Sequence, residues 1–276
     1  MKHVDAVPLH RRAALILAAV SVIGAALFTW PLFVAADATA AGWRDAPLVF
    51  ALLIGLMLAV AASEIASGGI DAKAVAVLGV LSAVGAALRP LGTGIAGFEP
   101  VFFLLILAGR VFGPGFGFLL GATTLFASAL TTAGIGPWLP YQMLAAAWIG
   151  AGAGLLPHMQ ARYERVLLAV YAVVAALLYG LMMNLSFWPF MLAGDTAISY
   201  VAGGSVSENL VRFVIFTLVT SLGFDIPRAV LTAVLVFLTA PTVLRVLRRA
   251  ARKAAFHAPV SFEGLLDGES SPHNVP

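Results

Sequence analysis

Two charged residues flank a glycine-containing connection between apolar segments of the sequence. Arg89 and Glu99 lie ten residues apart, and each borders a long apolar run. A charge beside hydrocarbon is costly, so it requires a partner or a ligand. Arg89 is the obvious partner for Glu99. We therefore predict that the two residues form a salt bridge across the connection, bind a polar ligand, or do both.

Three further side chains suited to ligand binding stand at the start of a later apolar segment. Trp138 and Tyr141 are of the types that gather at membrane–water interfaces. Gln142 lies about one turn further in, where an amide requires hydrogen-bond partners. We predict that all three contact a ligand, although interfacial anchoring also accounts for the two aromatic residues.

An amide also lies beside aromatic rings near the end of another apolar segment. Asn184 precedes Phe187 and Trp188 by three and four residues, a spacing that places them on one face of a helix. Such a face can hold a flat ligand that carries heteroatoms, so Asn184 and Trp188 are predicted ligand contacts. An amide that joins two helices is the alternative. For Asp225, which precedes Arg228 by three residues, we expect a structural role at a helix N-terminus.

Small residues recur every four positions in one apolar segment. Gly79, Ala83 and Ala87 would share a flat helix face that a neighbouring helix can approach closely. The neighbour is either a partner protein or another helix of this chain.

The residue types make several kinds of chemistry unexpected. The chain contains no cysteine, and its five histidines lie outside the apolar segments. Thiolate metal sites, cysteine nucleophiles and a histidine metal site inside a membrane are therefore excluded. The HExxH and GxxxxGK[ST] motifs are missing as well. We predict no catalytic residues, no metal site and no cofactor.

The elements that position these residues are predicted to be membrane-spanning helices. Hydrophobic residues make up 61% of the 276 and charged residues only 11%, against roughly 25% charged in a soluble domain. A helix needs about 20 apolar residues to cross a bilayer. Eight such segments are predicted, at residues 13–35, 47–63, 74–88, a two-helix hairpin within 97–131, 140–156, 166–192 and 229–244.

The basic residues predict the orientation of these segments. With the N-terminus inside, twelve of the 16 lysines and arginines lie on the cytoplasmic side and four outside. Both termini are thus predicted inside, and the basic cluster near the C-terminus reflects topology rather than nucleic-acid binding. The first segment is too long for the core of a signal peptide, so we expect it to be retained. Residues 251–276 are expected to form a disordered cytoplasmic tail.

One region fits the eight segments poorly. Residues 194–207 are too polar for lipid, whereas residues 209–222 are apolar but short. We predict a re-entrant or interfacial helix here, with Gly223 and Pro227 as the breaks before the last span.

Three motifs follow one another after Arg89. They are GFEPVFFLLILAGRVFGPGFG (97–117), GPWLPYQML (136–144) and a run of small residues (150–154). In this combination the chain resembles the substrate-binding S component of energy-coupling factor (ECF) transporters. The resemblance covers residues 72–250, which would supply a six-helix core. Residues 1–71 would add an N-terminal cytoplasmic segment and two extra helices of unknown role.

The resemblance implies a division of labour between subunits. The chain would bind a vitamin-like molecule at the outer face of a plasma membrane, in a bacterium. It would then associate with a transmembrane coupling protein through the face of Gly79, Ala83 and Ala87. ATP would be used only by two cytoplasmic ATPase subunits. In this family the connection that holds Arg89 and Glu99 closes over the substrate.

Two other classes of function compete with this interpretation. A self-sufficient secondary transporter would need internal repeats or charges at the membrane midplane, and neither is evident. A membrane-embedded enzyme would need a catalytic set, which is missing. The aromatic residues predicted around the site favour a flat, ring-bearing ligand. By resemblance a corrinoid is the first candidate and a thiamine-related compound the second.

Overall fold

A computed structural model describes most of the chain, namely residues 7, 9–33, 46–68, 70–92, 97–132, 134–191 and 196–254. All regular structure in these residues is helical. The elements are α1 (Arg11–Thr29), the 3-10 turn η1 (Trp30–Phe33), α3 (Ala46–Ala66), α4 (Ala72–Leu88), the 3-10 turn η2 (Arg89–Gly92), α5 (Val101–Phe112), α6 (Pro114–Thr132), α7 (Leu139–Leu155), α8 (Ala161–Met191), α9 (Val206–Thr220) and α10 (Leu222–Ala254). The prediction of an all-helical protein is confirmed for these residues.

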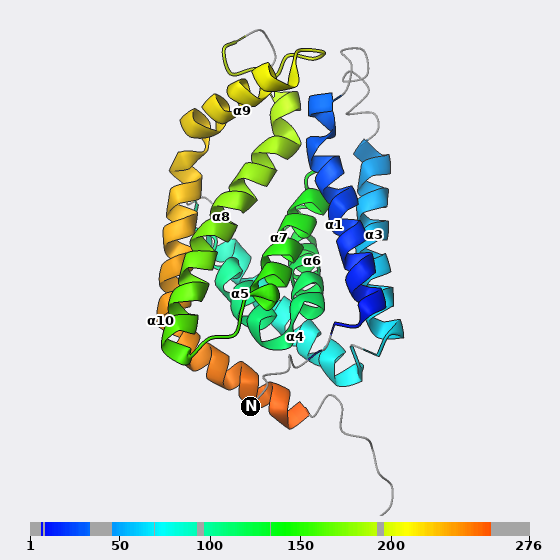
Figure 1. Cartoon of the computed structure of the whole chain (residues 1–276), viewed down its shortest axis with the longest axis vertical. Coiled ribbons are helices and arrows are strands. Elements are labelled where there is room, and N and C mark those ends of the chain that lie inside the picture. The colour runs from blue at the N-terminus through cyan, green and yellow to red at the C-terminus, as the bar shows by residue number, and fades with distance from the viewer. Residues whose placement is uncertain are drawn as a thin grey trace, which may run out of the picture.

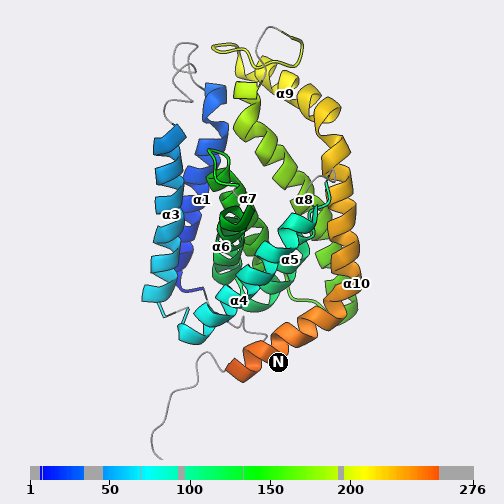
Figure 2. The ribbon, with the colours of Figure 1, turned by 180° about the vertical axis from the view of Figure 1, so that it is seen from behind.

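Three helices form the centre of the molecule. α5, α6 and α7 pack against one another, with α1 and α3 on one side and α8, α9 and α10 on the other (Figures 1 and 2). α4 packs mainly on α6 and leaves much of its surface exposed.

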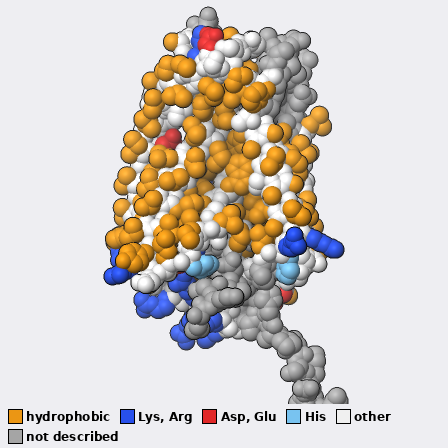
Figure 3. All heavy atoms as spheres, in the orientation of Figure 1, with side chains coloured by type: hydrophobic (Ala, Val, Ile, Leu, Met, Phe, Trp, Pro, Cys, Tyr) orange, Lys and Arg blue, Asp and Glu red, His pale blue; other side chains and the backbone are white. Residues whose placement is uncertain are grey.

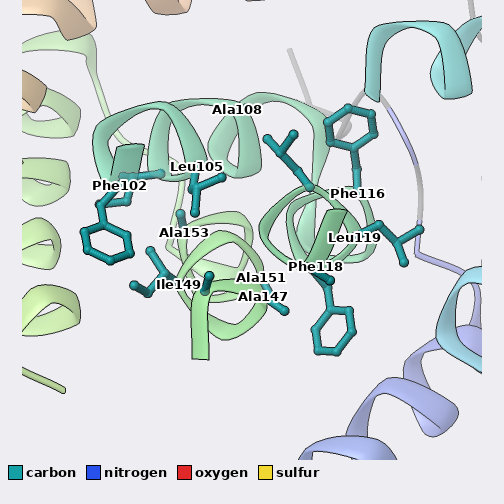
Figure 4. Packing of buried hydrophobic residues seen from close by; sticks show 14 of the residues in the cluster. Phe102, Leu105, Ala108, Phe116, Phe118, Leu119, Ala147, Ile149, Ala151 and Ala153 are labelled. Atoms are coloured by element: carbon teal, nitrogen blue, oxygen red, sulfur yellow. The ribbon is translucent and has the colours of Figure 1, made fainter. Parts of the chain in front are cut away.

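Glycine allows the central helices to approach closely. A Cβ atom on Gly109 of α5 or on Gly117 of α6 would collide with the backbone of Gly150 in α7. Around this contact the core is filled by alanine, leucine and phenylalanine side chains from all three helices (Figure 4). Dispersion contacts of this kind, rather than burial from water, hold helices together inside a bilayer.

The predicted hairpin within residues 97–131 is confirmed. α5 ends at Phe112, and the next residue is Gly113, whose φ of 99° lies in the region that favours glycine. Pro114 then opens α6, where its fixed φ suits the first helical position and its missing N–H costs nothing.

α1 packs on the central helices through α7. The Trp148 indole N–H donates to Ser21 Oγ at 3.0 Å, and the ring of Phe28 lies 5.0 Å from that of Tyr141. A Cβ on Gly24 would collide with the side chain of Leu144. The two N-terminal helices are therefore an integral part of the packed bundle.

A buried ion-pair network ties several elements together at one end of the molecule. Glu164 Oε1, in the first turn of α8, accepts hydrogen bonds from Arg110 Nε at 2.8 Å and from Arg248 Nη2 at 2.6 Å. Arg110 also donates to the backbone carbonyls of Leu156 and Pro157. We call this end, which carries Arg110, Glu164 and Arg248, the basic end. Lysine and arginine side chains gather there below a broad apolar surface (Figure 3).

The break before the last long helix differs from the prediction. α9 ends at Thr220, and α10 begins at Leu222 and runs through both Gly223 and Pro227. Pro227 lies in the second turn of α10, so it leaves the Gly223 carbonyl without its usual helical partner, and the space around Gly223 is open. α10 reaches Ala254, so it extends ten residues beyond the predicted end of the last span at 244. Of the predicted tail, residues 255–276 lie outside the described residues.

Five of the described helices are long and apolar enough to cross a membrane, namely α1, α4 with η2, α6, α8 and α10. α3 and α5 contribute shorter apolar helices. The lengths identify a membrane protein, while the count of eight crossings remains a prediction.

Candidate binding site

A pocket of about 310 Å³ lies where α4 ends and α7 begins, at the end of the three central helices that is remote from the basic end. It is formed by η2, the end of the connection to α5, the last turns of α6 and the start of α7. Its lining residues are Arg89, Pro90, Gly92, Glu99, Ser128, Thr132, Gly134 and Trp138. Three of the predicted ligand contacts, Arg89, Glu99 and Trp138, therefore meet at one pocket.

Arg89 is held by Gln142 rather than by Glu99. Arg89 Nη2 donates to Gln142 Oε1 at 2.7 Å, which fixes the guanidinium across the top of α7. The predicted salt bridge between Arg89 and Glu99 is wrong. Gln142 offers a partly buried acceptor one turn inside α7, whereas Glu99 finds a different cation. Gln142 thus belongs to the site by orienting Arg89.

Glu99 pairs with a residue of the last long helix. Arg228 Nε lies 2.5 Å from Glu99 Oε2, and Arg228 Nη1 lies 2.6 Å from Asp225 Oδ1. The Arg228 guanidinium also stands 5.4 Å from the centre of the Tyr179 ring. Gly97 packs against the Phe224 carbonyl so closely that a Cβ would collide with it. The connection that lines the pocket is therefore fastened to α10.

Asp225 has a structural role, as expected. Its carboxylate is in the first turn of α10, forms an ion pair with Arg228 three residues later, and lies against Gly180 of α8. Two carboxylates thus share one buried guanidinium. This network leaves a formal negative charge near the pocket wall that Glu99 forms.

Ser128 is a pocket residue that the sequence interpretation missed. Its side chain is fully buried, and its Oγ has no hydrogen-bond partner among the described residues. A buried hydroxyl without a partner is costly unless a ligand or water satisfies it. Nothing in the sequence distinguishes this serine from others on apolar helices, because its role depends on the approach of η2 to α6.

The other predicted ligand contacts lie elsewhere. Tyr141 packs against Phe28 of α1. Asn184 Nδ2 donates to Ser221 Oγ at 2.7 Å, so this amide joins α8 to the end of α9. Trp188 is fully buried in an aromatic cluster, and its N–H donates to the Ile198 carbonyl at 2.8 Å. For Asn184, the alternative of an amide that joins two helices fits this arrangement.

The small-residue face of α4 points outward. Gly79, Ala83 and Ala87 are exposed, and a Cβ on Gly79 would meet no atom within 4 Å. The opposite face of α4 is the one that packs, with Ser82 Oγ 2.7 Å from Thr123 Oγ1 and Gly85 against Thr124 of α6. The face of Gly79, Ala83 and Ala87 is thus left free by the described helices of this chain.

The site is equipped for noncovalent binding. A guanidinium, a carboxylate, a buried hydroxyl and an indole ring surround a volume at the small end of ligand pockets, which run from about 300 to 1,000 Å³. These groups can pair with a charged or hydrogen-bonding ligand and stack on its ring.

Comparison with known families identifies the family of the chain. The family model described as "ECF transporter, substrate-specific component" matches residues 73–240, which is more than half of the chain. The chain belongs to this family. It is therefore a membrane protein and a substrate-specific component of the ECF type, a family of transport proteins rather than enzymes. No curated protein and no solved structure matches the chain.

Proposed function

We propose that the chain captures a small vitamin-like molecule in the pocket between η2, α6 and α7. The observation that carries this proposal is the convergence of Arg89, Glu99 and Trp138 around the buried, unpartnered hydroxyl of Ser128. Groups that are costly to leave unsatisfied are expected where a ligand satisfies them.

The pocket favours a compact ligand. A corrinoid, the first candidate from the resemblance, carries a four-ring macrocycle and long side chains that exceed about 310 Å³. A thiamine-like compound with one or two rings is the better fit. A positively charged ring would find Glu99 and the face of Trp138, while polar substituents would find Arg89 and Ser128.

Delivery would require partner subunits. We propose that the exposed face of Gly79, Ala83 and Ala87 packs against a transmembrane coupling protein, and that two cytoplasmic ATPase subunits supply the energy. Eight crossings with both termini inside would place the pocket at the outer face and the basic end in the cytoplasm.

The proposal is tested by ligand-dependent thermal unfolding of the chain in detergent. A panel of thiamine, riboflavin, biotin, pantothenate and a corrinoid is screened, because a ligand that binds the folded state raises the unfolding midpoint. We expect thiamine or a close relative to give the largest shift. The Kd of that compound should be about fivefold higher for Ser128→Ala than for the wild type, because one neutral hydrogen bond is lost.

Ser186→Ala is the matched control. Its hydroxyl is bonded to the Met183 carbonyl of its own helix, and the residue does not line the pocket. A ligand that shifts the midpoint equally in wild type and Ser128→Ala would place binding elsewhere. A folded sample that responds to no compound in the panel would count against a vitamin-like substrate.

A further inference from the structure

A second pocket, of about 460 Å³, lies at the basic end between the first turns of α8 and the C-terminal part of α10. We call it the arginine pocket. It is lined by Ala161, Arg162, Glu164, Arg165, Ala240, Pro241, Leu244, Arg245, Arg248 and Arg252. Five arginines face one glutamate, so the lining carries a formal charge of +4.

Among the described residues, no further acidic side chain balances the charge of this pocket. Glu164, its acidic residue, already accepts hydrogen bonds from both Arg110 and Arg248. Arg248 keeps a buried Nε that has no hydrogen-bond partner within the described part of the chain. An anion in the pocket would satisfy this donor and offset the repulsion among the arginines.

A proline shapes the pocket wall. Pro241 lacks an N–H, so it leaves the carbonyl of Phe237 without its usual helical partner. Arg165 Nε donates to that carbonyl at 2.5 Å, and its guanidinium lies 3.6 Å from the centre of the Phe237 ring. Arg165 is thereby fixed on one wall. Beyond this point α10 turns across the end of the bundle (Figure 1).

The surface next to the pocket is apolar. Val166 and Val170 of α8 are 51% and 57% exposed, and Leu238 of α10 is 65% exposed. Ala240, Pro241 and Leu244 continue this apolar character into the pocket itself. A ligand that fits both parts has an anionic head and apolar chains. A free phosphate ion would use only the arginines.

We propose that the arginine pocket binds the phosphate headgroup of an anionic phospholipid, whose acyl chains lie along α8 and α10. Basic pockets at the cytoplasmic ends of membrane helices suit such headgroups. Binding would brace the first turn of α8 against the bent part of α10. This site shares no lining residue with the pocket between η2, α6 and α7, so the inference does not depend on the transported substrate.

The test uses the full chain in a phosphate-free detergent solution. Dioleoylphosphatidylglycerol, dioleoylphosphatidylcholine and inorganic phosphate are titrated separately while the thermal unfolding midpoint is measured. We expect saturable stabilisation by phosphatidylglycerol and none by the other two at equal concentration. Stabilisation by inorganic phosphate alone would assign the pocket to a soluble anion, and equal stabilisation by phosphatidylcholine would show that no headgroup is recognised. Either result overturns the proposal.

Arg245 and Arg252 are the residues to change, because neither takes part in the hydrogen bonds to Glu164. Each glutamine substitution should weaken phosphatidylglycerol binding about fivefold, and the double variant roughly 25-fold. Arg249→Gln removes the same charge from an exposed neighbour that does not line the pocket, and it should bind normally.

The charge-preserving double variant Arg245→Lys and Arg252→Lys guards against misfolding, since it should retain most of the binding. If Arg249→Gln and the double glutamine variant lost phosphatidylglycerol affinity equally, the effect would come from overall charge. That result would overturn the proposed site. An acidic peptide is titrated in parallel. Stabilisation by the peptide but not by phosphatidylglycerol would also overturn the proposal and assign the surface to a protein partner.

Discussion

At the scale of single residues, the binding pocket depends on how two arginines are oriented. Arg89 is fixed by Gln142 across the start of α7, and Arg228 is fixed between Glu99 and Asp225 at the start of α10. Hydrogen bonds to charged groups contribute about 1.5–3 kcal/mol, more than neutral ones. These bonds therefore hold the polar wall of the pocket before a ligand arrives, which lowers the entropy lost on binding.

Gln142→Ala should separate orientation from stability. Without its acceptor, Arg89 loses its fixed position, and we expect the Kd of the ligand found in the panel to rise about tenfold. The unfolding midpoint of the ligand-free protein should change little, because Gln142 is only partly buried. Isothermal titration and thermal unfolding of the same sample measure the two quantities.

Asn184→Ala supplies the opposite pattern as a control. Its amide joins α8 to Ser221 outside the pocket, so we expect a loss of about 1 kcal/mol in stability with an unchanged Kd. A large loss of affinity in Asn184→Ala, with no loss in Gln142→Ala, would show that the ligand binds near α8 and α9 instead.

At the scale of helices, the sequence was sufficient to predict most elements. The run of apolar residues and the Gly113–Pro114 pair are local signals, and the helices they predict are present. Contacts between helices were harder to predict. Glu99 and Arg228, for example, lie 129 residues apart and meet only because α10 packs beside the connection to α5. Likewise, Ser128 became a pocket residue only through the contact of η2 with α6.

α4 carries the exposed face at which we propose that a partner helix packs. Ala83→Trp places an indole on a face that the described helices of this chain leave uncovered, so folding and ligand binding should be retained. Close approach of a partner helix would be blocked. We therefore expect co-purification with the coupling protein and cellular uptake of the ligand to fall at least tenfold.

Ala59→Trp is the matched control for that substitution. Ala59 is an exposed alanine on α3, so the change adds the same bulk to a different helix. Normal uptake in Ala83→Trp, or equal loss in both variants, would argue against α4 as the docking face.

At the scale of the whole molecule, the binding pocket lies near the start of α10 and the arginine pocket lies beside its C-terminal part. α8 and α10 pack along each other between the two pockets. α1 and α3 precede the residues that match the family, yet they pack on α6 and α7 as part of the same core. Composition and charge predicted a membrane bundle and its orientation. The packing of α1 on α7 could not be predicted, because contacts such as Trp148 with Ser21 have no signature along the chain.

The orientation itself is testable because the natural chain contains no cysteine. Single cysteines are introduced at Ala202, before α9, at Met159, before α8, and at Arg249, near the end of α10; all three sites are exposed. A maleimide that cannot cross membranes is applied to intact and to permeabilised cells. With both termini inside and α9 with α10 making one crossing, Ala202→Cys should react in intact cells, whereas Met159→Cys and Arg249→Cys should react only after permeabilisation. Reaction of Arg249→Cys in intact cells would mean that α9 and α10 do not form one crossing. If Ala202→Cys reacted only after permeabilisation and the other two variants reacted in intact cells, the bundle would have the inverted orientation. The arginine pocket would then lie outside, away from the leaflet in which anionic lipids bind basic segments.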